Sequence, residues 1–431
     1  MQKIKIMNFG PITDVELDIS NFTTLIGPQA SGKSTISKAV YFFKSLRDDF
    51  MKYALESVEE KNFDIPVSTF GKKIKTKFME FWGTTYHMKD IFLQFYYIEK
   101  KHITLTIKKG YLNIDFSKEL SSDISNTFKQ LNLLTKKFDK KDNKFLTSAE
   151  IIALESEKNI LFKKIQDLAY WIFNDKREFI FIPAGRSLLS TLTEQLQNIE
   201  TNKLDYLMRV FLNRINNSKK NFNKNLNQIV LEKKKLTTDV VDTERVKLAQ
   251  SLITKILKGV YINDTDGEKL FFAEKKFTRL NFSSSGQQES IWILLLIFIM
   301  ILNLKDVFVV FEEPEAHLYP IAQKEIVDLI SLLASTADNQ IIITTHSPYI
   351  LTSINNLLFA CKLGKTYRIK VSEIVDPKIW IECESFQSFY ISGGKKENII
   401  DKESKLIKTE LIDNVSSIIN EKYDKLLKLD E

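Results

Sequence analysis

The stretch that decides the fold is GPQASGKS, from Gly27 to Ser34. It follows the apolar run Phe22–Ile26 and precedes Ile36–Val40, whose apolar residues recur at helical spacing. A glycine-rich loop between a strand and a helix is typical of phosphate-binding loops, because its backbone N–H groups and the helix N-terminus together surround a phosphate. A glycine turn with a chance Gly-Lys-Ser is the alternative, and the flanking strand and helix argue against it. The sequence therefore predicts a nucleoside triphosphate site.

The loop residues have distinct expected roles. Lys33 places a positive charge at the β- and γ-phosphate oxygens, and the Ser34 hydroxyl is expected to be a ligand of Mg²⁺. A nucleoside triphosphate and Mg²⁺ are therefore the cofactors that these residues predict. The residues expected to contact the nucleotide here are Gly27, Pro28, Gln29, Ala30, Ser31, Gly32, Lys33, Ser34 and Thr35.

A second segment supplies two adjacent acids. The continuous apolar run Val307–Phe311 predicts a buried strand, and Glu312 and Glu313 follow it directly. In P-loop enzymes an acid at the end of such a strand holds Mg²⁺ through its water shell, and we assign this role to Glu312. Glu313 is then placed to polarise a water against the γ-phosphate. A solvated acidic turn is the alternative interpretation.

Two further segments contain polar residues next to apolar elements. Serines and a glycine precede the apolar run 291–302 and predict a capped helix N-terminus with exposed backbone donors. This segment alone indicates only a helix start. The apolar run Ile341–Thr345 predicts a strand that ends at His346, which can hydrogen-bond a γ-phosphate or an attacking water. The residues expected to bind nucleotide in the serine-rich segment are Ser284, Ser285, Gly286 and Gln287.

Together the motifs resemble a known family. GPQASGKS, SSSGQQES, FVVFEEPEAHLYP and IIITTHSPYIL occur in the order found in ABC-type ATPases. They are similar to the ATPase domain of the OLD/RecF-like branch of that superfamily, soluble relatives of SMC proteins that include AAA-type ATPases of bacterial phage-defence systems. The resemblance covers about residues 1–60 and 280–360. Transporter-type members have Asp where this sequence has Glu312, and the longer side chain should still reach a Mg²⁺-bound water.

The resemblance implies a dimer that closes around ATP. The phosphate loop of one subunit and the signature of the other would meet at a shared γ-phosphate, with Ser284 and Gly286 offered to the partner. Glu313 would activate water, His346 would be the switch histidine, and His317 would lie in a loop that touches the partner. Lys33, Glu313 and His346 are the catalytic residues that we predict, and the predicted Mg²⁺ ligands are Ser34 and Glu312.

Composition is compatible with these assignments. The chain has 431 residues, with 13 glycines and 8 prolines, and so few helix breakers indicate long helices. No signal peptide is visible, and the run 291–302 is shorter than a membrane span, so we read it as a buried helix. Cys361 and Cys383 are expected to be reduced thiols. These features predict a cytoplasmic protein.

We predict an α/β protein: an ABC-type P-loop NTPase head, a mixed sheet flanked by helices, with a large α-helical insertion and a small C-terminal α/β cap. The head would comprise 1–117 and 259–360, the insertion 118–258, and the cap 361–431. A head strand near 178–186 would cross the insertion and end at Arg186. That arginine would lie near the nucleotide or the dimer interface, or would pair with a nearby carboxylate.

Shorter patterns complete the expected organisation. Ile103–Ile107 and Tyr111–Ile114 predict a hairpin, and strands are expected near 367–373 and 379–383. A Gly393-Gly394 turn follows, and then an amphipathic helix packed on the head or docked on a partner. The tail is too short for the nuclease domain of OLD proteins and has no Asp-x-Asp, so no nuclease activity is expected. The apolar stripe of the predicted helix comprises Leu406, Leu411, Val415, Ile418, Ile419, Tyr423 and Leu426.

The predicted insertion is rich in lysine, and the whole chain has a net charge of +7. Clustered lysines can bind a nucleic-acid backbone, but such runs are commonly a solvated helix face, and a partner protein fits equally well. The lysines in question are Lys136, Lys137, Lys140, Lys141, Lys144, Lys219, Lys220, Lys224, Lys233, Lys234 and Lys235.

Three functions compete. The preferred hypothesis is a regulatory ATPase of a prokaryotic anti-phage system, acting as a dimer or larger homo-oligomer on a separately encoded effector, a nuclease or toxin. The second is a DNA repair or recombination ATPase of the RecF or SMC type that binds DNA directly. The third, a transporter subunit, fits poorly because the insertion is large and Glu-Glu-Pro-Glu-Ala-His-Leu differs from the Asp-Glu-Ala-Thr usual there.

Overall fold

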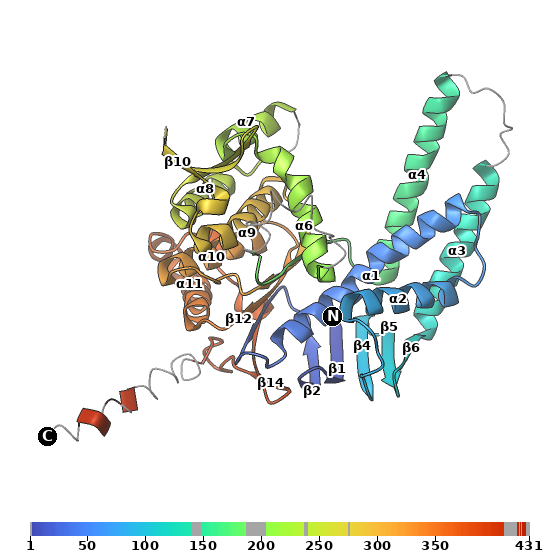
Figure 1. Cartoon of the computed structure of the whole chain (residues 1–431), viewed down its shortest axis with the longest axis horizontal. Helices are drawn as coiled ribbons and strands as arrows, with labels where there is room; N and C mark the ends of the chain where they lie inside the picture. The colour runs from blue at the N-terminus through green and yellow to red at the C-terminus, as the bar shows by residue number, and fades with distance from the viewer. Residues whose placement is uncertain are drawn as a thin grey trace. The chain divides into compact units, whose positions relative to one another are not determined.

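The chain forms two compact units (Figure 1). The first comprises Met1–Ile19, Ser34–Phe179 and Gly393–Lys395. The second comprises Ser20–Lys33, Ile180–Ser392 and Lys396–Glu431. The structure is a computed structural model that describes residues 2–138, 148–186, 204–236, 240–274, 276–408, 420, 421, 423 and 425–427.

An antiparallel sheet forms the basis of the first unit. Its strand order is β2-β1-β4-β5-β6. Alternate side chains of β1, β4 and β5 are buried, as expected for a sheet with one face against a core. The predicted hairpin is confirmed, since Leu105 pairs with Ile114. The strand bounds are β1 Lys3–Phe9, β2 Ile12–Asp18, β4 Ile91–Ile98, β5 Lys101–Lys108 and β6 Tyr111–Phe116.

Helices complete the first unit, and α3 contacts both α2 and α4 (Figure 1). Aromatic rings fill the space between elements: Phe50, for example, lies 5.4 Å from Phe70 and 5.5 Å from Phe173 between ring centroids. A buried ion pair joins Lys44 Nζ to Asp175 Oδ2 at 2.5 Å. The helix bounds are α1 Lys33–Glu59, α2 Pro66–Trp82, α3 Lys118–Phe138 and α4 Ser148–Phe173.

A six-stranded sheet organises the second unit, in the order β14-β13-β3-β12-β11-β7. β13, β3, β12 and β11 are parallel neighbours, so their carboxyl ends lie at one edge. The predicted strand before Arg186 is confirmed as β7, next to β11. The bounds are β3 Phe22–Ile26, β7 Glu178–Ile182, β11 Val307–Glu312, β12 Gln340–Thr345, β13 Phe386–Ser392 and β14 Lys395–Asn398. The α/β fold class predicted from the sequence, with sheets flanked by helices, is confirmed.

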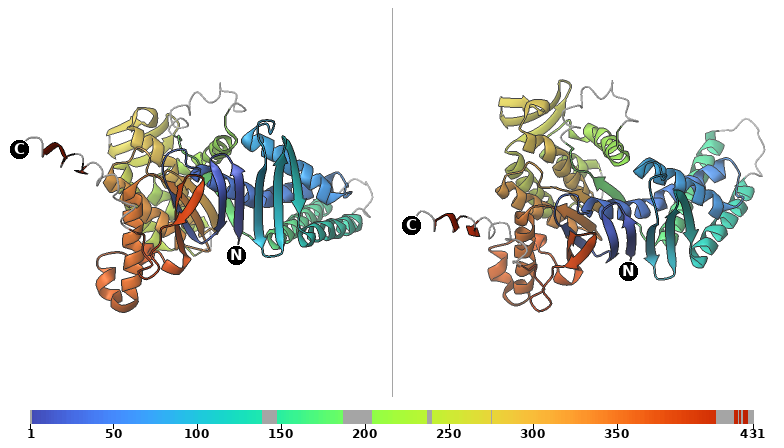
Figure 2. Two further views of the ribbon diagram at one scale, coloured as in Figure 1. Left: turned by 90° about the horizontal axis from the view of Figure 1, so that it is seen from below. Right: turned by 60° about the horizontal axis from the view of Figure 1, so that its bottom comes forward.

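In the second unit α8 and α10 pack against α9, most of whose side chains are buried, and α11 packs against α10. α9 is long and apolar enough to cross a membrane, but 72% of it is buried inside the protein, so it is a core helix as predicted. In Figure 2 the yellow strands β8–β10 form a small sheet apart from the six-stranded one. The bounds are α6 Tyr206–Lys219, α7 Leu226–Leu236, α8 Thr243–Leu257, α9 Ser285–Leu302, α10 Pro320–Ala334, α11 Pro348–Ser372, β8 Val260–Asp264, β9 Gly267–Ala273 and β10 Lys276–Arg279.

The C-terminal region differs from the sequence prediction. Residues 367–373 do not form a strand, because α11 continues through them with a kink at Tyr367. The alternation of Tyr367, Ile369 and Val371 resembles a strand, yet Tyr367 is 57% and Ile369 77% exposed, so no sheet buries that face. Residues 379–383 also lie outside any strand, and the strand is β13 instead. The predicted turn at Gly393-Gly394 is confirmed, since it links β13 to β14.

The predicted terminal helix is wrong at its start. Leu406 lies in a bend, where the neighbouring Ile407 pairs with Ile400 as an isolated bridge. Tyr423 and Leu426 are helical, and both are more than 60% exposed. The remaining residues of the stripe lie outside the described residues, namely Leu411, Val415, Ile418 and Ile419.

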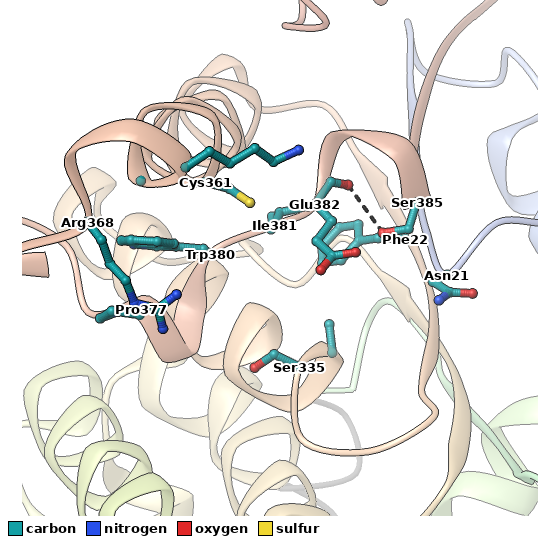
Figure 3. A pocket seen from close by; sticks show the side chains of 13 residues that line it. Asn21, Phe22, Ser335, Cys361, Arg368, Pro377, Trp380, Ile381, Glu382 and Ser385 are labelled. Carbon is teal, nitrogen blue, oxygen red and sulfur yellow. Dashed lines mark hydrogen bonds between the residues drawn. The ribbon is translucent and has the colours of Figure 1, made fainter. Parts of the chain in front are cut away.

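A cavity of about 500 Å³ lies beside α11 in the second unit (Figure 3). The Trp380 indole forms one wall and packs on Gly364, where a Cβ would lie 2.2 Å from the ring. Phe22, the first residue of β3, also lines the cavity, whereas Gly27 follows the last residue of that strand. The cavity is therefore at the opposite end of β3 from the phosphate loop.

Candidate nucleotide site

Close packing and unusual backbone angles shape the phosphate loop. A Cβ on Gly27 would lie 2.1 Å from Ile391 O at the end of β13, so a glycine is required there. Gly32 has φ +105°, a left-handed conformation that glycine adopts without strain. Ala30, with φ 58°, is also left-handed. The loop then enters α1, as the sequence predicted, and Lys33 is the first residue of that helix.

Lys33 lies over the loop from which it comes. Its Nζ donates to Gly27 O at 2.9 Å and to Pro28 O at 2.7 Å, and lies 3.5 Å from His346 Nδ1. Burial lowers the pKa of the Lys33 ammonium, while the negative charges of Glu313 and Glu315 oppose that shift. An ammonium desolvated in this way favours an anionic partner such as a phosphate.

The two predicted acids occupy different environments at the end of β11. Glu312 ends the strand and is only 4% exposed, and its Oε2 accepts a hydrogen bond from Ala184 N at 3.3 Å. Glu313 is more open, and its Oε1 lies 3.0 Å from His346 Nε2. The structure therefore brings Lys33, Glu313 and His346 together at the carboxyl ends of the parallel strands.

Glu313 also has a strained backbone. Its φ is 44°, which is left-handed and unfavourable for a residue with a Cβ. Its N–H donates to Thr344 O at 2.9 Å, and this bond continues the pairing of β11 with β12. Strained residues of this kind cluster at functional sites, where surrounding contacts hold them.

Glu315 is a site residue to which the sequence analysis assigned no role. It is 8% exposed, and its Oε1 accepts from Thr345 Oγ1 at 2.5 Å and from His346 N at 3.0 Å. Burial raises the pKa of its carboxyl group above the ordinary value. Glu315 therefore fixes the backbone from which His346 projects. Its position as the third acid of Glu-Glu-Pro-Glu is the sequence signal that could have drawn attention to it.

The signature segment caps α9 as predicted. Ser284 Oγ accepts from Gln287 N at 3.4 Å, the Gln287 side chain accepts in return from Ser284 N, and Ser284 and Ser285 are exposed. Gly286 packs against the loop after β11, because a Cβ there would lie 2.7 Å from His317 O. Within one chain, the signature helix thus contacts the loop that also contains Glu313 and Glu315.

Arg186 is buried, with 2% of its surface accessible, and lies at the end of β11 beside the two predicted acids. Its Nη1 donates to Glu312 O at 2.8 Å and its Nη2 to Glu313 O at 3.0 Å. The other predicted possibility, an ion pair with a nearby carboxylate, is partly confirmed, since Arg186 Nη2 lies 3.8 Å from Glu289 Oε1.

The donor set fits Mg²⁺ as nucleotide enzymes use it. Among the described residues, no group of three or more His, Cys, Asp or Glu side chains could hold a metal ion. Mg²⁺ in nucleotide enzymes usually takes one or two protein ligands and completes its shell with phosphates and waters. The buried Glu312 carboxylate, at the strand end beside Arg186, fits such a role. Ser34 and Thr35 stand in the first turn of α1.

Comparison with known proteins agrees with a nucleotide site. A family model described as AAA ATPase domain matches residues 1–351. The chain belongs to the AAA ATPase domain family. Members of this family are ATPases, which bind a nucleotide, usually with Mg²⁺. No curated protein matches the chain.

Solved structures of low identity also resemble this AAA ATPase. An SMC head bound to the C-winged helix domain of ScpA is 13% identical, with a TM-score of 0.40, and the match covers 92% of this chain and 96% of that one. An SMC head domain from Thermotoga maritima is 11% identical, with a TM-score of 0.36 and coverage of 92% and 97%. An Smc head domain with an extended coiled coil, bound to the C-terminal domain of ScpA from Pyrococcus furiosus, is 14% identical, with a TM-score of 0.37 and coverage of 93% and 96%.

Proposed function

We propose that this AAA ATPase is of the OLD/RecF-like, ABC-type branch, and that it closes as a dimer around Mg·ATP to control a separate effector in prokaryotic anti-phage defence. The observation that carries the ATPase mechanism is the convergence of Lys33, Glu313 and His346, with Glu313 Oε1 3.0 Å from His346 Nε2. The effector would be a nuclease or toxin.

Each converging residue has a chemical task in hydrolysis. Glu313 accepts a proton from the attacking water, which is general-base catalysis. His346 orients the Glu313 carboxylate through Nε2 and faces the γ-phosphate. Lys33 leaves its loop carbonyls for the phosphate oxygens and neutralises charge as the phosphoryl group transfers. Ser34 and Glu312 would be the residues that hold Mg²⁺, which would supply further stabilisation of the negative charge on the phosphates.

Exposed groups around the signature support a dimer. Ser284 and Ser285 present hydroxyls at the N-terminus of α9, where helix N–H groups favour an anion such as a γ-phosphate. Large apolar side chains flank the signature and the His317 loop in sequence: Phe282 is 76%, Tyr319 75% and Ile321 69% exposed. Exposed apolar residues near a functional segment are typical of a protein interface.

The test is ATP-dependent dimerisation of Glu313→Gln, measured by size-exclusion chromatography with light scattering. The substitution keeps the hydrogen-bonding shape but removes the base, so turnover should fall about 10²- to 10⁴-fold while ATP stays bound. We expect a monomer without nucleotide and a dimer with Mg·ATP. The double variant Glu313→Gln/Ser284→Arg should bind ATP as a monomer. Equal ATP-dependent dimerisation of the double variant would remove the signature from the interface.

The effector is tested separately from the ATP site. Co-expression with the product of an adjacent reading frame, followed by co-purification, should recover a nuclease or toxin whose activity depends on the state of the ATPase. Phage plaque counts on cells that carry both genes measure defence. Protection by the ATPase gene alone, without a partner, would contradict the proposal of a separate effector.

The RecF-like alternative depends on the lysines, and their contacts in α6 and α7 bear on it. Lys219 and Lys224 form ion pairs with Glu268 and Glu232. Lys233 donates to Leu302 O at 3.0 Å and to Asn303 Oδ1 at 2.6 Å, at the C-terminal end of α9. Lys233 therefore caps the C-terminal end of α9, and this structural role accounts for its positive charge without a contact to nucleic acid.

Duplex DNA binding as a function of salt separates the two functions. Lys234 and Lys235 are the variants to use, because neutralising Lys233 would also weaken the end of α9. If DNA is the partner, neutralising these two lysines should reduce the salt dependence of binding by about one phosphate contact each. An unchanged slope would favour the effector-controlling function.

A further inference from the structure

The guanidinium of Arg186 joins three separate segments of the second unit. Nη1 donates to Pro183 O at 2.7 Å and to Glu312 O at 2.8 Å, Nη2 to Glu313 O at 3.0 Å, and Nε to Glu289 O at 3.1 Å. A guanidinium has five N–H donors in a rigid plane, and four of them here meet main-chain carbonyls. The segments are the loop after β7, helix α9 and the end of β11.

The contact with α9 is made twice. Besides the bond from Nε to the main chain of Glu289, the backbone N–H of Arg186 donates to Glu289 Oε1 at 3.2 Å. Glu289 is 1% exposed and stands five residues after Ser284 in α9. One turn of the signature helix is therefore fixed to Arg186 by both its backbone and its carboxylate.

The contact with β11 falls where the chain changes direction. Arg186 binds the carbonyls of two consecutive residues, Glu312 and Glu313, and the second has φ 44°. A carbonyl held in place restricts the backbone torsions of Glu313, and these torsions limit the rotamers that its side chain can adopt. The carboxylates of Glu289, Glu312, Glu313 and Glu315 also act electrostatically on the guanidinium.

We propose that Arg186 is a positioning residue that fixes Glu312 and Glu313 relative to the signature helix, so that α9 and the two acids keep one geometry during hydrolysis. This inference rests on the proposed function of Glu313. Arg186 is only 2% exposed, and its contacts with the two acids are hydrogen bonds to their main-chain carbonyls. Its loss should therefore lower turnover and leave ATP affinity intact.

The variant that tests this is Arg186→Lys. Lysine keeps the charge, but its ammonium has three N–H donors on one nitrogen instead of five in a rigid plane, so it cannot bond all four carbonyls that the guanidinium meets. A displacement of about 1 Å in catalytic groups can cost about 100-fold in rate, so we expect kcat to fall about 10- to 100-fold with ATP Kd changed less than about threefold. Turnover is normalised to bound nucleotide, so that a loss of folded protein does not count as a loss of catalysis.

A matched control exists in the first unit. Arg47 is 4% exposed and also donates to two main-chain carbonyls, those of Asp175 at 3.0 Å and Arg177 at 2.7 Å. Arg47→Lys should lower the melting temperature without lowering turnover per bound nucleotide. If Arg186→Lys does not fold, Arg186→Gln is the second variant, since its neutral amide avoids a buried unpaired charge.

The double variant Arg186→Lys/Glu313→Gln distinguishes the possible failures. If Arg186 acts through Glu313, Arg186→Lys should add less than about threefold to the loss caused by Glu313→Gln. Additive losses would overturn the inference while keeping Glu313 as the base. Full turnover of Arg186→Lys beside an inactive Glu313→Gln would overturn it as well. An active Glu313→Gln would instead refute the proposed function, and the positioning role with it.

Discussion

Gly286→Ala tests the contact between the signature helix and the loop after β11. A Cβ at this position would lie 2.7 Å from His317 O, whereas carbon and oxygen atoms in close contact prefer about 3.3 Å or more. The helix or the loop must therefore move by about 0.6 Å. Overpacking of this kind lowers the free energy of unfolding by about 1–3 kcal/mol, and the higher helix propensity of alanine offsets about 1 kcal/mol of this loss. The net destabilisation should be about 0–2 kcal/mol.

The matched control is Gly71→Ala in α2. There the nearest atom to a new Cβ is Phe116 Cε2 at 3.6 Å, an ordinary contact, so only the propensity gain applies and stability should rise by up to about 1 kcal/mol. Thermal melting of both variants measures this contrast. Phosphate release should show about a 10-fold loss for Gly286→Ala and none for Gly71→Ala, because only the first displaces the loop that contains Glu313.

One result would refute this reasoning. If Gly286→Ala melts as high as Gly71→Ala and hydrolyses ATP at the wild-type rate, the approach of α9 to His317 does not constrain the site. A stable but inactive Gly286→Ala would separate the two effects. It would mean that the substitution impairs the contact of the signature with nucleotide and leaves the packing within the chain intact.

Three other substitutions have defined outcomes. Lys33→Ala should abolish ATP binding and protection from phage, and a fully protective variant would make the nucleotide incidental. Burial raises the pKa of Glu315 above 4.5, so its contribution to the free energy of unfolding falls as pH rises from 4.5 through the folded-state pKa. Glu315→Gln keeps an acceptor oxygen but does not titrate. The melting temperature of the variant should therefore rise relative to that of the wild type as pH rises. A difference in melting temperature that does not change with pH would contradict this. Lys44→Met removes the shorter of the two ion pairs of the buried Asp175 carboxylate, which keeps Arg177 Nη1 at 3.3 Å, and should cost about 1–3 kcal/mol in urea unfolding, against less than about 0.5 kcal/mol for the exposed Lys52→Met.

The sequence correctly predicted those structural elements that are determined by residues close together in the chain. The phosphate loop, β11 and the start of α9 each combine an apolar run with a turn or cap, and all three formed where predicted. Local alternation failed at Tyr367–Val371, because a helix that starts at Pro348 continues through it. Period-two patterns predict a strand only when a sheet buries one face of them, and that depends on the rest of the fold.

The contacts of Arg186 could not be read from the sequence. It follows an apolar strand and a Pro-Ala-Gly turn, which marked it as a candidate, but its partners Glu312 and Glu313 are 126 and 127 positions away. A strand-end arginine has the same local pattern whether it faces solvent, a phosphate or backbone carbonyls. Burial decides between these outcomes, and burial follows from the placement of β7 beside β11.

The loop from Glu313 to Leu318 holds the carboxylate that we propose as the general base. Glu313 and His317 both have left-handed backbone angles, and such residues cost about 1–3 kcal/mol each unless their surroundings hold them. Glu313 is bonded through its N–H to Thr344 O and through its carbonyl to Ala316 N and Arg186, and Leu318 N donates to Glu315 O. All of these bonds lie within the chain, so the direction of the Glu313 backbone is set by the fold itself. A carboxylate oriented in advance needs little reorganisation when water attacks, which is the condition for efficient electrostatic catalysis.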